Sequence, residues 1–200
     1  MKTAAVLCQA LLAASASAGV ITRSDLSPSA VTISFNDLAN ATPVTTQYQP
    51  IGATFLSQLG APTTDNTNAS FYGPLGNGNI LRSNGSSTTL RCVLPGGAPA
   101  ATSAMGADII FRDTNQTTTL RVYDVNDVLL GSAITPPDTG IGDEVFLGFA
   151  APNIAYGVFE FDPADTYVGI DNASFEPIPA PGIGAVLLVG CSGVCRRRSA

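Results

Sequence analysis

Residues Thr118–Ala133 have the sequence TTLRVYDVNDVLLGSA, and this stretch decides the fold class. β-Branched and apolar residues dominate Thr118–Val125 and again Val128–Ala133, a composition typical of strands. Asn126 and Asp127 separate the two segments at the spacing of a two-residue turn. The stretch therefore predicts a β-hairpin.

The same kind of segment recurs on both sides of this hairpin. Further strands are expected at 31–35, 51–56, 88–94, 107–112, 144–149, 155–161 and 167–175. The polar stretch Ala61–Asn79 is expected to be a long loop with one short strand near Phe71, and Thr135–Gly140 contains two prolines that suit a loop. No segment between Gly19 and Glu176 has a helical period with caps. The sequence predicts one all-β domain at 19–176, an antiparallel β-sandwich of jelly-roll type, with a closed barrel as the alternative.

The N-terminus has the composition of an export signal. Lys2 gives a positive start, Ala4–Ala14 an apolar segment, and Ala16-Ser17-Ala18 a small-residue cleavage site. We expect residues 1–18 to be a signal peptide and the mature chain to begin at Gly19.

The C-terminus, residues 177–200, combines three features in order. A proline-rich segment, Pro177–Gly182, precedes the uncharged segment Ile183–Val194, and an arginine cluster follows at Arg196, Arg197 and Arg198. As a helix the uncharged segment would span about 18 Å, short for a hydrocarbon core of about 30 Å. The arginines would remain on the cytoplasmic side of the membrane. We expect a short transmembrane segment at 183–194, with an ordinary anchor or a buried terminus as alternatives.

This tail resembles the PEP-CTERM tail of bacterial surface proteins. The motif residues are Pro179, Ala180, Pro181 and Gly182, together with the arginine cluster; alanine stands where the family usually has glutamate. The resemblance implies export, a membrane-inserted intermediate and processing by an exosortase. It also implies a final location at the cell surface or in the extracellular matrix of a Gram-negative-type bacterium.

Charge and cysteine content limit the possible partners. The segment between the two ends holds five basic and fifteen acidic residues, a net charge of −10. Such a surface repels phosphate backbones, so nucleic-acid binding is not expected. Cys92 is the one cysteine of that segment and is expected to be a buried small side chain on a strand.

Three strings between the two ends resemble parts of galactose-binding-like jelly rolls. These are ISFNDL at 33–38, LRVYD at 120–124 with LLG at 129–131, and GIDNASF at 169–175. In such domains the first and last strands often lie side by side and share a structural calcium ion. The resemblance implies a calcium site from Asn36, Asp37, Asp171 and Asn172, whose oxygens suit that ion. The alternative is that Asp37 and Asp171 accept backbone N–H bonds at strand ends.

The sequence contains few of the residues that catalytic sites commonly use. The chain has no histidine, its only lysine lies in the signal segment, and no Gly-x-Ser-x-Gly motif occurs. Acidic residues such as Asp162 and Asp165 suit a turn better than the carboxylate pair of a glycosidase. We expect a protein that is not an enzyme.

Sugar binding is the main alternative to a purely structural role. Tyr48, Tyr72 and Tyr156 would serve as stacking platforms if they project from loops, and partial burial is their other interpretation. The first hypothesis is a non-catalytic adhesive or structural surface protein. The second is a carbohydrate-binding module for extracellular polysaccharide, and a remote third is a secreted glycoside hydrolase.

Overall fold

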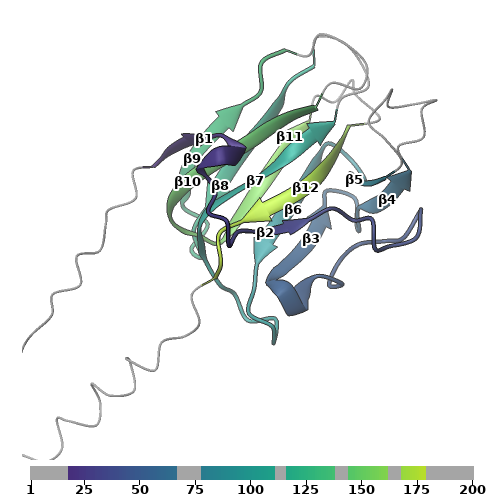
Figure 1. Ribbon diagram of the computed structural model, residues 1–200, viewed down its shortest axis with the longest axis horizontal. Coiled ribbons are helices and arrows are strands. Elements are labelled where there is room, and N and C mark those ends of the chain that lie inside the picture. Colours follow the sequence, from purple (N-terminus) through teal and green to yellow (C-terminus); the bar gives the residue numbers. More distant parts are fainter. Residues whose placement is uncertain (1–17, 67–77, 111–115, 138–143, 162–167, 179–200) are drawn as a thin grey trace, which may run out of the picture.

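The computed structural model describes residues 18–66, 78–110, 116–137, 144–161 and 168–178, and these form two antiparallel β-sheets packed face to face (Figure 1). The seven-stranded sheet has the order β1 (Gly19–Ile21), β10 (Glu144–Ile154), β7 (Thr102–Ile110), β12 (Gly169–Phe175), β5 (Asn79–Arg82) and β4 (Thr63–Asn66), and β2 (Val31–Ile33) also pairs with β12. The five-stranded sheet has the order β3 (Ala53–Ser57), β6 (Ser87–Cys92), β11 (Tyr156–Phe161), β8 (Thr118–Tyr123) and β9 (Leu129–Ile134).

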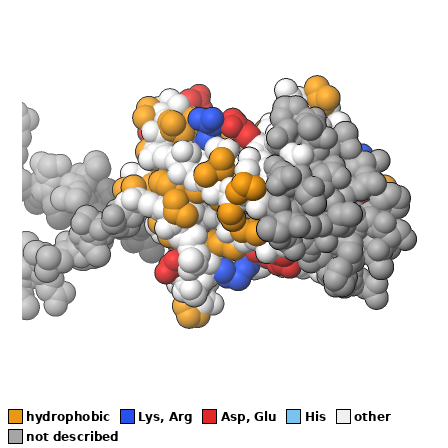
Figure 2. Space-filling view, turned by 90° about the horizontal axis from the view of Figure 1, so that it is seen from above, with side chains coloured by type: hydrophobic (Ala, Val, Ile, Leu, Met, Phe, Trp, Pro, Cys, Tyr) orange, Lys and Arg blue, Asp and Glu red, His pale blue; other side chains and the backbone are white. Residues whose placement is uncertain are grey.

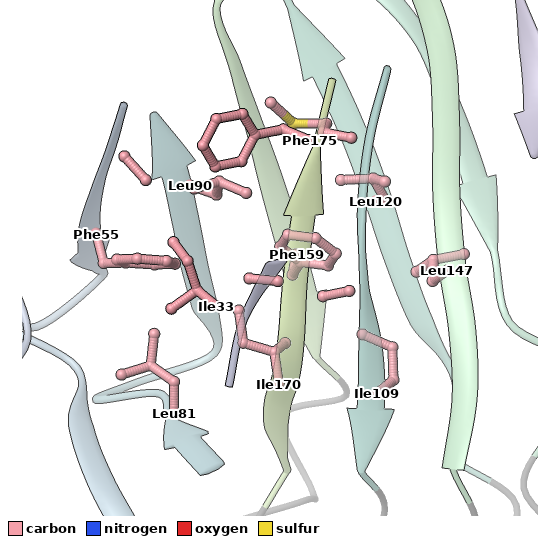
Figure 3. Packing of buried hydrophobic residues seen from close by; sticks show 14 of the residues in the cluster. Ile33, Phe55, Leu81, Leu90, Ile109, Leu120, Leu147, Phe159, Ile170 and Phe175 are labelled. Atoms are coloured by element: carbon pink, nitrogen blue, oxygen red, sulfur yellow. The ribbon is translucent and has the colours of Figure 1, made fainter. Parts of the chain in front are cut away.

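The core lies between the sheets and follows from the two-residue period of the strands. Side chains on alternate positions point to the same face, so each strand gives one set to the core. Figure 3 shows Ile109, Leu147 and Ile170 of the seven-stranded sheet facing Leu90, Leu120 and Phe159 of the five-stranded sheet. All six side chains are buried. We call the side of each sheet that turns away from this core its outer face.

One end of the core is aromatic. Phe35, Tyr48 and Phe55 contact one another edge to face, with ring centroids 5.3 to 6.1 Å apart. Edge-to-face contact brings the positive edge of one ring to the negative face of another, which stabilises the packing beyond the area buried. Phe35 adopts a φ of 58°, so the chain turns out of β2 directly after the strand.

The prediction of an antiparallel β-sandwich is confirmed. The strands form two separate sheets, so the alternative of a closed barrel is wrong. The strands expected around 31–35, 51–56, 88–94, 107–112, 144–149, 155–161 and 167–175 correspond to β2, β3, β6, β7, β10, β11 and β12. The long loop expected at 61–79 is wrong in part, because it contains β4 and the start of β5. Phe71 lies outside the described residues.

The predicted hairpin is present, but its two-residue turn is wrong. Tyr123 pairs with Leu129, so five residues connect β8 to β9. The Asp124 carboxylate accepts hydrogen bonds from the backbone N–H groups of Asn126 (2.8 Å) and Val128 (2.9 Å), and Asp127 has a φ of 61°. The Asp124 backbone N–H also donates to the Val128 carbonyl at 3.0 Å, so side-chain and backbone bonds together stabilise the longer loop.

The two chain ends fall largely outside this description. β1 begins at Gly19, directly after the expected cleavage site at Ala16 and Ala18. Within the described ranges no helical segment is long and apolar enough to cross a lipid bilayer. The expected signal segment up to residue 17 and the tail from Pro179 onward, with its motif residues and arginine cluster, lie outside the described residues.

Candidate binding site

Five side chains form a row across the outer face of the five-stranded sheet. Thr54 lies opposite Arg91, Arg91 opposite Tyr156, Tyr156 opposite Tyr123, and Tyr123 opposite Leu129. Their neighbours along each strand, such as Leu90, Cys92, Leu120 and Val122, point into the core. The alternation of four strands therefore places a planar cation, two phenol rings and a hydroxyl side by side on the solvent side.

The planar groups of this row are stacked. The rings of Tyr123 and Tyr156 lie 4.9 Å apart at an interplanar angle of 14°. The Arg91 guanidinium carbon lies 4.5 Å from the centre of the Tyr156 ring. Because β6 and β8 flank β11 on opposite sides, Arg91 and Tyr123 cover opposite faces of Tyr156. The Tyr156 ring is thus a support for Arg91 and presents no free face to a sugar ring.

A hydrogen bond fixes the free end of Tyr156. Its hydroxyl donates to the Asp127 carboxylate at 2.8 Å. Burial, this hydrogen bond and the charge of Asp127 raise the pKa of Tyr156 to about 12, so the hydroxyl stays protonated and keeps donating at neutral pH. Asp127 belongs to the loop between β8 and β9, so this loop contacts the stack through the Tyr156 hydroxyl.

A groove of about 430 Å³ opens beside the stack. The polar part of its lining, called here the polar wall, includes hydroxyl, amide, guanidinium and carboxylate groups, from Thr45, Thr46, Gln49, Thr54, Arg91 and Asp127. Leu56 and Val125 add apolar contacts and are 46% and 59% exposed. The loop carrying Gly97 and Pro99 closes one end, held to η2 (Gln49–Ile51) by a hydrogen bond from the Gln49 amide to the Pro95 carbonyl at 3.1 Å. Figure 2 shows one face of the molecule. Apolar side chains gather in the middle of its described surface, and basic side chains lie apart from one another.

The structure describes two of the three tyrosines predicted to bind sugar, and the environments of these two differ. Tyr156 lies at the groove, whereas Tyr48 is 7% exposed, packs on Phe35 and Phe55, and donates its hydroxyl to Asp37 at 2.5 Å. Burial, this bond and the charge of Asp37 raise the pKa of the Tyr48 hydroxyl. A ring in that position stacks on no ligand from solvent. Tyr72 lies outside the described residues.

The residues predicted to bind calcium have separate partners. β2 and β12 do pair, as expected for the first and last strands of the predicted domain. The Asn36 side-chain oxygen, however, accepts the backbone N–H of Asn79 at 2.7 Å, and Asp37 accepts the bond from Tyr48. Asp171 accepts the backbone N–H of Asn172 at 2.6 Å, and the Asn172 amide donates to Asp108 at 2.9 Å. In the described ranges no group of three or more His, Cys, Asp or Glu side chains is arranged to hold a metal ion.

Asp108 is the centre of a carboxyl cluster on the outer face of the seven-stranded sheet. It lies opposite Phe146 of β10 and Asp171 of β12, and it is 3% exposed although it points away from the core. Arg23 of η1 (Arg23–Asp25) covers it, making an ion pair with Asp108 and lying 4.7 Å above the Phe146 ring. The N-terminal segment thus covers Asp108 and Phe146 on this face.

Two acids of the cluster, Glu144 and Asp171, have raised pKa values. A hydrogen bond to Asp108, burial, and the nearby charges of Asp108 and Asp171 raise the pKa of Glu144 to about 7. Burial, with a smaller contribution from Asp108, raises the pKa of Asp171 to about 6. Through these contacts the cluster joins three strands to the N-terminal segment, which is a structural role.

The remaining residues considered from the sequence have structural partners as well. Glu160 pairs with Arg121 at 2.8 Å on the outer face of the five-stranded sheet, while Asp162 and Asp165 lie outside the described residues. Cys92 is buried in the core as predicted, and burial raises the pKa of its thiol to about 12.

Sequence reasoning missed Arg91 and Tyr123 as parts of the site. Each lies at an outward position of a predicted strand, which is a signal that the sequence contains. What the sequence does not give is that β6, β11 and β8 are neighbours, because β11 comes some 30 residues or more after either partner in the chain.

Comparison with known proteins gives no family. No family model and no curated protein matches the chain. Among solved structures, the enzymatically active domain of tailspike protein 4 from bacteriophage CBA120 is similar over 72% of this chain at 13% identity and a TM-score of 0.34. The K2 cleaved adhesin domain of Lys-gingipain is similar over 73% of this chain at 10% identity and a TM-score of 0.33. This chain spans 22% of the tailspike chain and 98% of the adhesin domain.

Proposed function

We propose that this protein is an exported, non-catalytic β-sandwich that binds extracellular polysaccharide in the groove beside Arg91 and Tyr156, and so acts in adhesion or in a surface matrix. The observation that carries the proposal is the groove itself, at about 430 Å³ with six polar side chains among its lining residues. Its size lies within the roughly 300–1,000 Å³ typical of small-molecule sites.

The groove's lining suits sugars. Threonine hydroxyls both donate and accept hydrogen bonds, as sugar hydroxyls do, and the Gln49 amide offers both functions on one planar group. Leu56 and Val125 contact the C–H faces of a pyranose ring, in place of the aromatic stacking predicted for Tyr156. The tyrosine then contributes by holding the polar wall in shape.

The strand order supports a finer description of the fold. Strands β5 to β12 contribute the orders β10-β7-β12-β5 and β6-β11-β8-β9 to the two sheets. That arrangement matches the eight strands of a double-sheet jelly roll, and β1, β2, β3 and β4 add to its edges. We infer a jelly roll, a fold whose outer faces and loops are free to carry binding sites.

The chain ends support surface display. We propose that residues 1–18 direct export and that Pro179–Gly182, the uncharged segment 183–194 and Arg196–Arg198 direct membrane insertion and exosortase processing. The intact mass of the protein from the cell that makes it tests both cleavages in one measurement. A chain that keeps both Met1 and Ala200 would contradict this part of the proposal.

Retention on polysaccharide tests the binding function. The purified protein is passed over immobilised extracellular polysaccharide of the producing cell, next to the variants Tyr156→Ala and Ile134→Ala. We expect Tyr156→Ala to elute early and Ile134→Ala, an exposed side chain at the far edge of the same sheet, to be retained like the parent.

Two results would contradict the binding function. The first is a parent protein that is not retained, and the second is an equal loss of retention in both variants. Release of sugar products from the polysaccharide would contradict the non-catalytic part of the proposal.

A further inference from the structure

Arg91 differs from the other arginines that the structure describes. Arg23, Arg82 and Arg121 each have a carboxylate within ion-pair distance, namely Asp108, Asp65 and Glu160. Within the described ranges Arg91 has no carboxylate partner, and its guanidinium lies on the face of Tyr156 instead. An unpaired cation is uncommon in a segment that carries fifteen acidic and five basic residues.

The guanidinium of Arg91 packs on an aromatic ring that has partners of its own. Tyr156 supports one of its faces, and Tyr156 is itself fixed by Tyr123 and Asp127. Arg91 lines the groove together with Thr54, its partner on the next strand. A side chain that is ordered before binding loses less entropy when a ligand arrives, so its hydrogen bonds contribute more to affinity.

We propose that the glycan bound in this groove carries a uronic acid, and that Arg91 binds its carboxylate. This inference rests on the proposed function and names the class of sugar. The planar fork of a guanidinium matches a carboxylate with two parallel N–H···O bonds, and such charge-assisted pairs are stronger than neutral hydrogen bonds. The threonines and Gln49 on the same wall then hold the sugar's hydroxyls.

The charge of the protein restricts how that uronic acid is presented. The segment from Gly19 to Glu176 carries a net charge of −10, which repels dense polyanions at long range. The groove lining holds one cation, Arg91, and one anion, Asp127, whose carboxylate accepts the Tyr156 hydroxyl. The ligand is therefore a glycan in which single uronic acids are separated by neutral sugars.

Two oligosaccharides that differ in one group test the inference. The first is a short β-linked glucose oligosaccharide with one glucuronic acid, and the second is the same molecule with that carboxylate reduced to the alcohol, which makes it neutral. Calorimetric titration of the purified protein should show about tenfold or tighter binding of the acidic form, the range expected for a charge-assisted hydrogen bond. A sulfated oligosaccharide of equal length tests whether any anion suffices, and we expect it to bind more weakly than the uronate.

Two matched variants assign the preference to one side chain. Arg91→Gln should bind both oligosaccharides with the affinity that the parent has for the neutral one. Arg121→Gln, on the same outer face but paired with Glu160, should keep the parent's preference. Because the Arg91 side chain is exposed, Arg91→Gln should melt at the parent's temperature.

Each contrary result has a distinct meaning. Equal affinity of the parent for both oligosaccharides, a preference that survives in Arg91→Gln, or stronger binding of the sulfated form overturns the inference and leaves the proposed function standing. Failure of both oligosaccharides to bind also overturns it. The proposed function falls with it only when the polysaccharide column does not retain the parent either.

Discussion

The two outer faces of the sandwich use arginine and aromatic side chains in opposite ways. On the seven-stranded sheet, Arg23 lies over Phe146 and pairs with Asp108, which is 3% exposed. On the five-stranded sheet, Arg91 lies over Tyr156 and pairs with no described carboxylate. Both arginines make a cation–π contact at similar distance, 4.7 and 4.5 Å, yet one charge is paired within the fold and the other has no described carboxylate partner.

An aromatic contact alone therefore does not mark a binding site. A charge that is covered and paired joins elements of the fold, and its loss leaves a buried charge without compensation. A charge that is supported but unpaired has its orientation fixed and its hydrogen-bond donors unused. Stability should therefore depend on the first face and binding on the second.

Arg23→Met should cause the greatest loss of stability. Removing Arg23 leaves the Asp108 carboxylate buried without a cation, with the Asn172 amide and the Glu144 carboxyl as its described hydrogen-bond partners. We expect the free energy of unfolding to fall by about 2–3 kcal/mol, less than the 3–5 kcal/mol for a fully buried pair, because the Arg23 side chain is 42% exposed. Urea unfolding of the purified protein measures it.

Arg121→Met is the matched control on the opposite face. Its ion pair with Glu160 is exposed on both sides, at 43% and 42%, and such pairs add little to stability. We expect unfolding that matches the parent's. Equal destabilisation by both substitutions would mean that the two faces do not differ in the way described.

The second expected effect is a dependence of stability on pH. Folding raises the pKa of Glu144 from 4.5 to about 7 and that of Asp171 from 3.8 to about 6. The folded state therefore binds more protons than the unfolded state between these values, and stability falls as pH rises from 3.8 to about 7. We expect the melting temperature to be several degrees lower at pH 8 than at pH 5.

Two glutamine variants test which carboxyl group causes the dependence of stability on pH. Glu144→Gln should be more stable than the parent at pH 8 and should show a smaller difference between the two pH values. Glu160→Gln, on the five-stranded sheet, should keep the parent's difference. Asp25 and Asp124, whose pKa values are lowered, act in the opposite direction and only below about pH 4, outside this window. A parent melting temperature that rises from pH 5 to pH 8 would contradict the carboxyl cluster as described.

The strands can be predicted where the two-residue pattern is strong. β8 and β11 alternate fully between buried and partly exposed residues, and composition predicts both. It does not predict β4, because the sequence TTDN is polar and forms a strand through pairing with β5 and through bonds such as that from the Thr64 hydroxyl to the Ala39 carbonyl at 2.6 Å. Tertiary pairing of this kind has no local signal in the sequence.

The site can be predicted only in part for the same reason. Tyr48 lies in the polar string TTQYQP and Tyr156 begins the string YGVFEF, yet the fold places the first in the aromatic core and the second at the groove. The predicted calcium site assumed that β2 and β12 are neighbours, and these strands do pair. Asp171, however, points to the outer face beside Asp108. Asp108 is more than 60 residues away in the sequence, and no local pattern indicates that contact. Residues distant in the sequence decide both outcomes.

Among the changes expected to destabilise the protein, Tyr123→Leu should have the smallest effect, and it tests whether the stack serves binding. Losing one stacked ring should lower the free energy of unfolding by about 1 kcal/mol, since leucine still covers the sheet. Without Tyr123 on its far face, Tyr156 no longer holds Arg91 in one orientation, so we expect affinity for the uronate-bearing oligosaccharide to fall severalfold while affinity for the neutral one changes less. Tyr123→Phe keeps the ring and should behave like the parent in both assays. If Tyr123→Leu lowers stability but leaves the preference for the uronate unchanged, then Arg91 is oriented by something other than the rings beside it, and the stack belongs with the structural contacts of the opposite face.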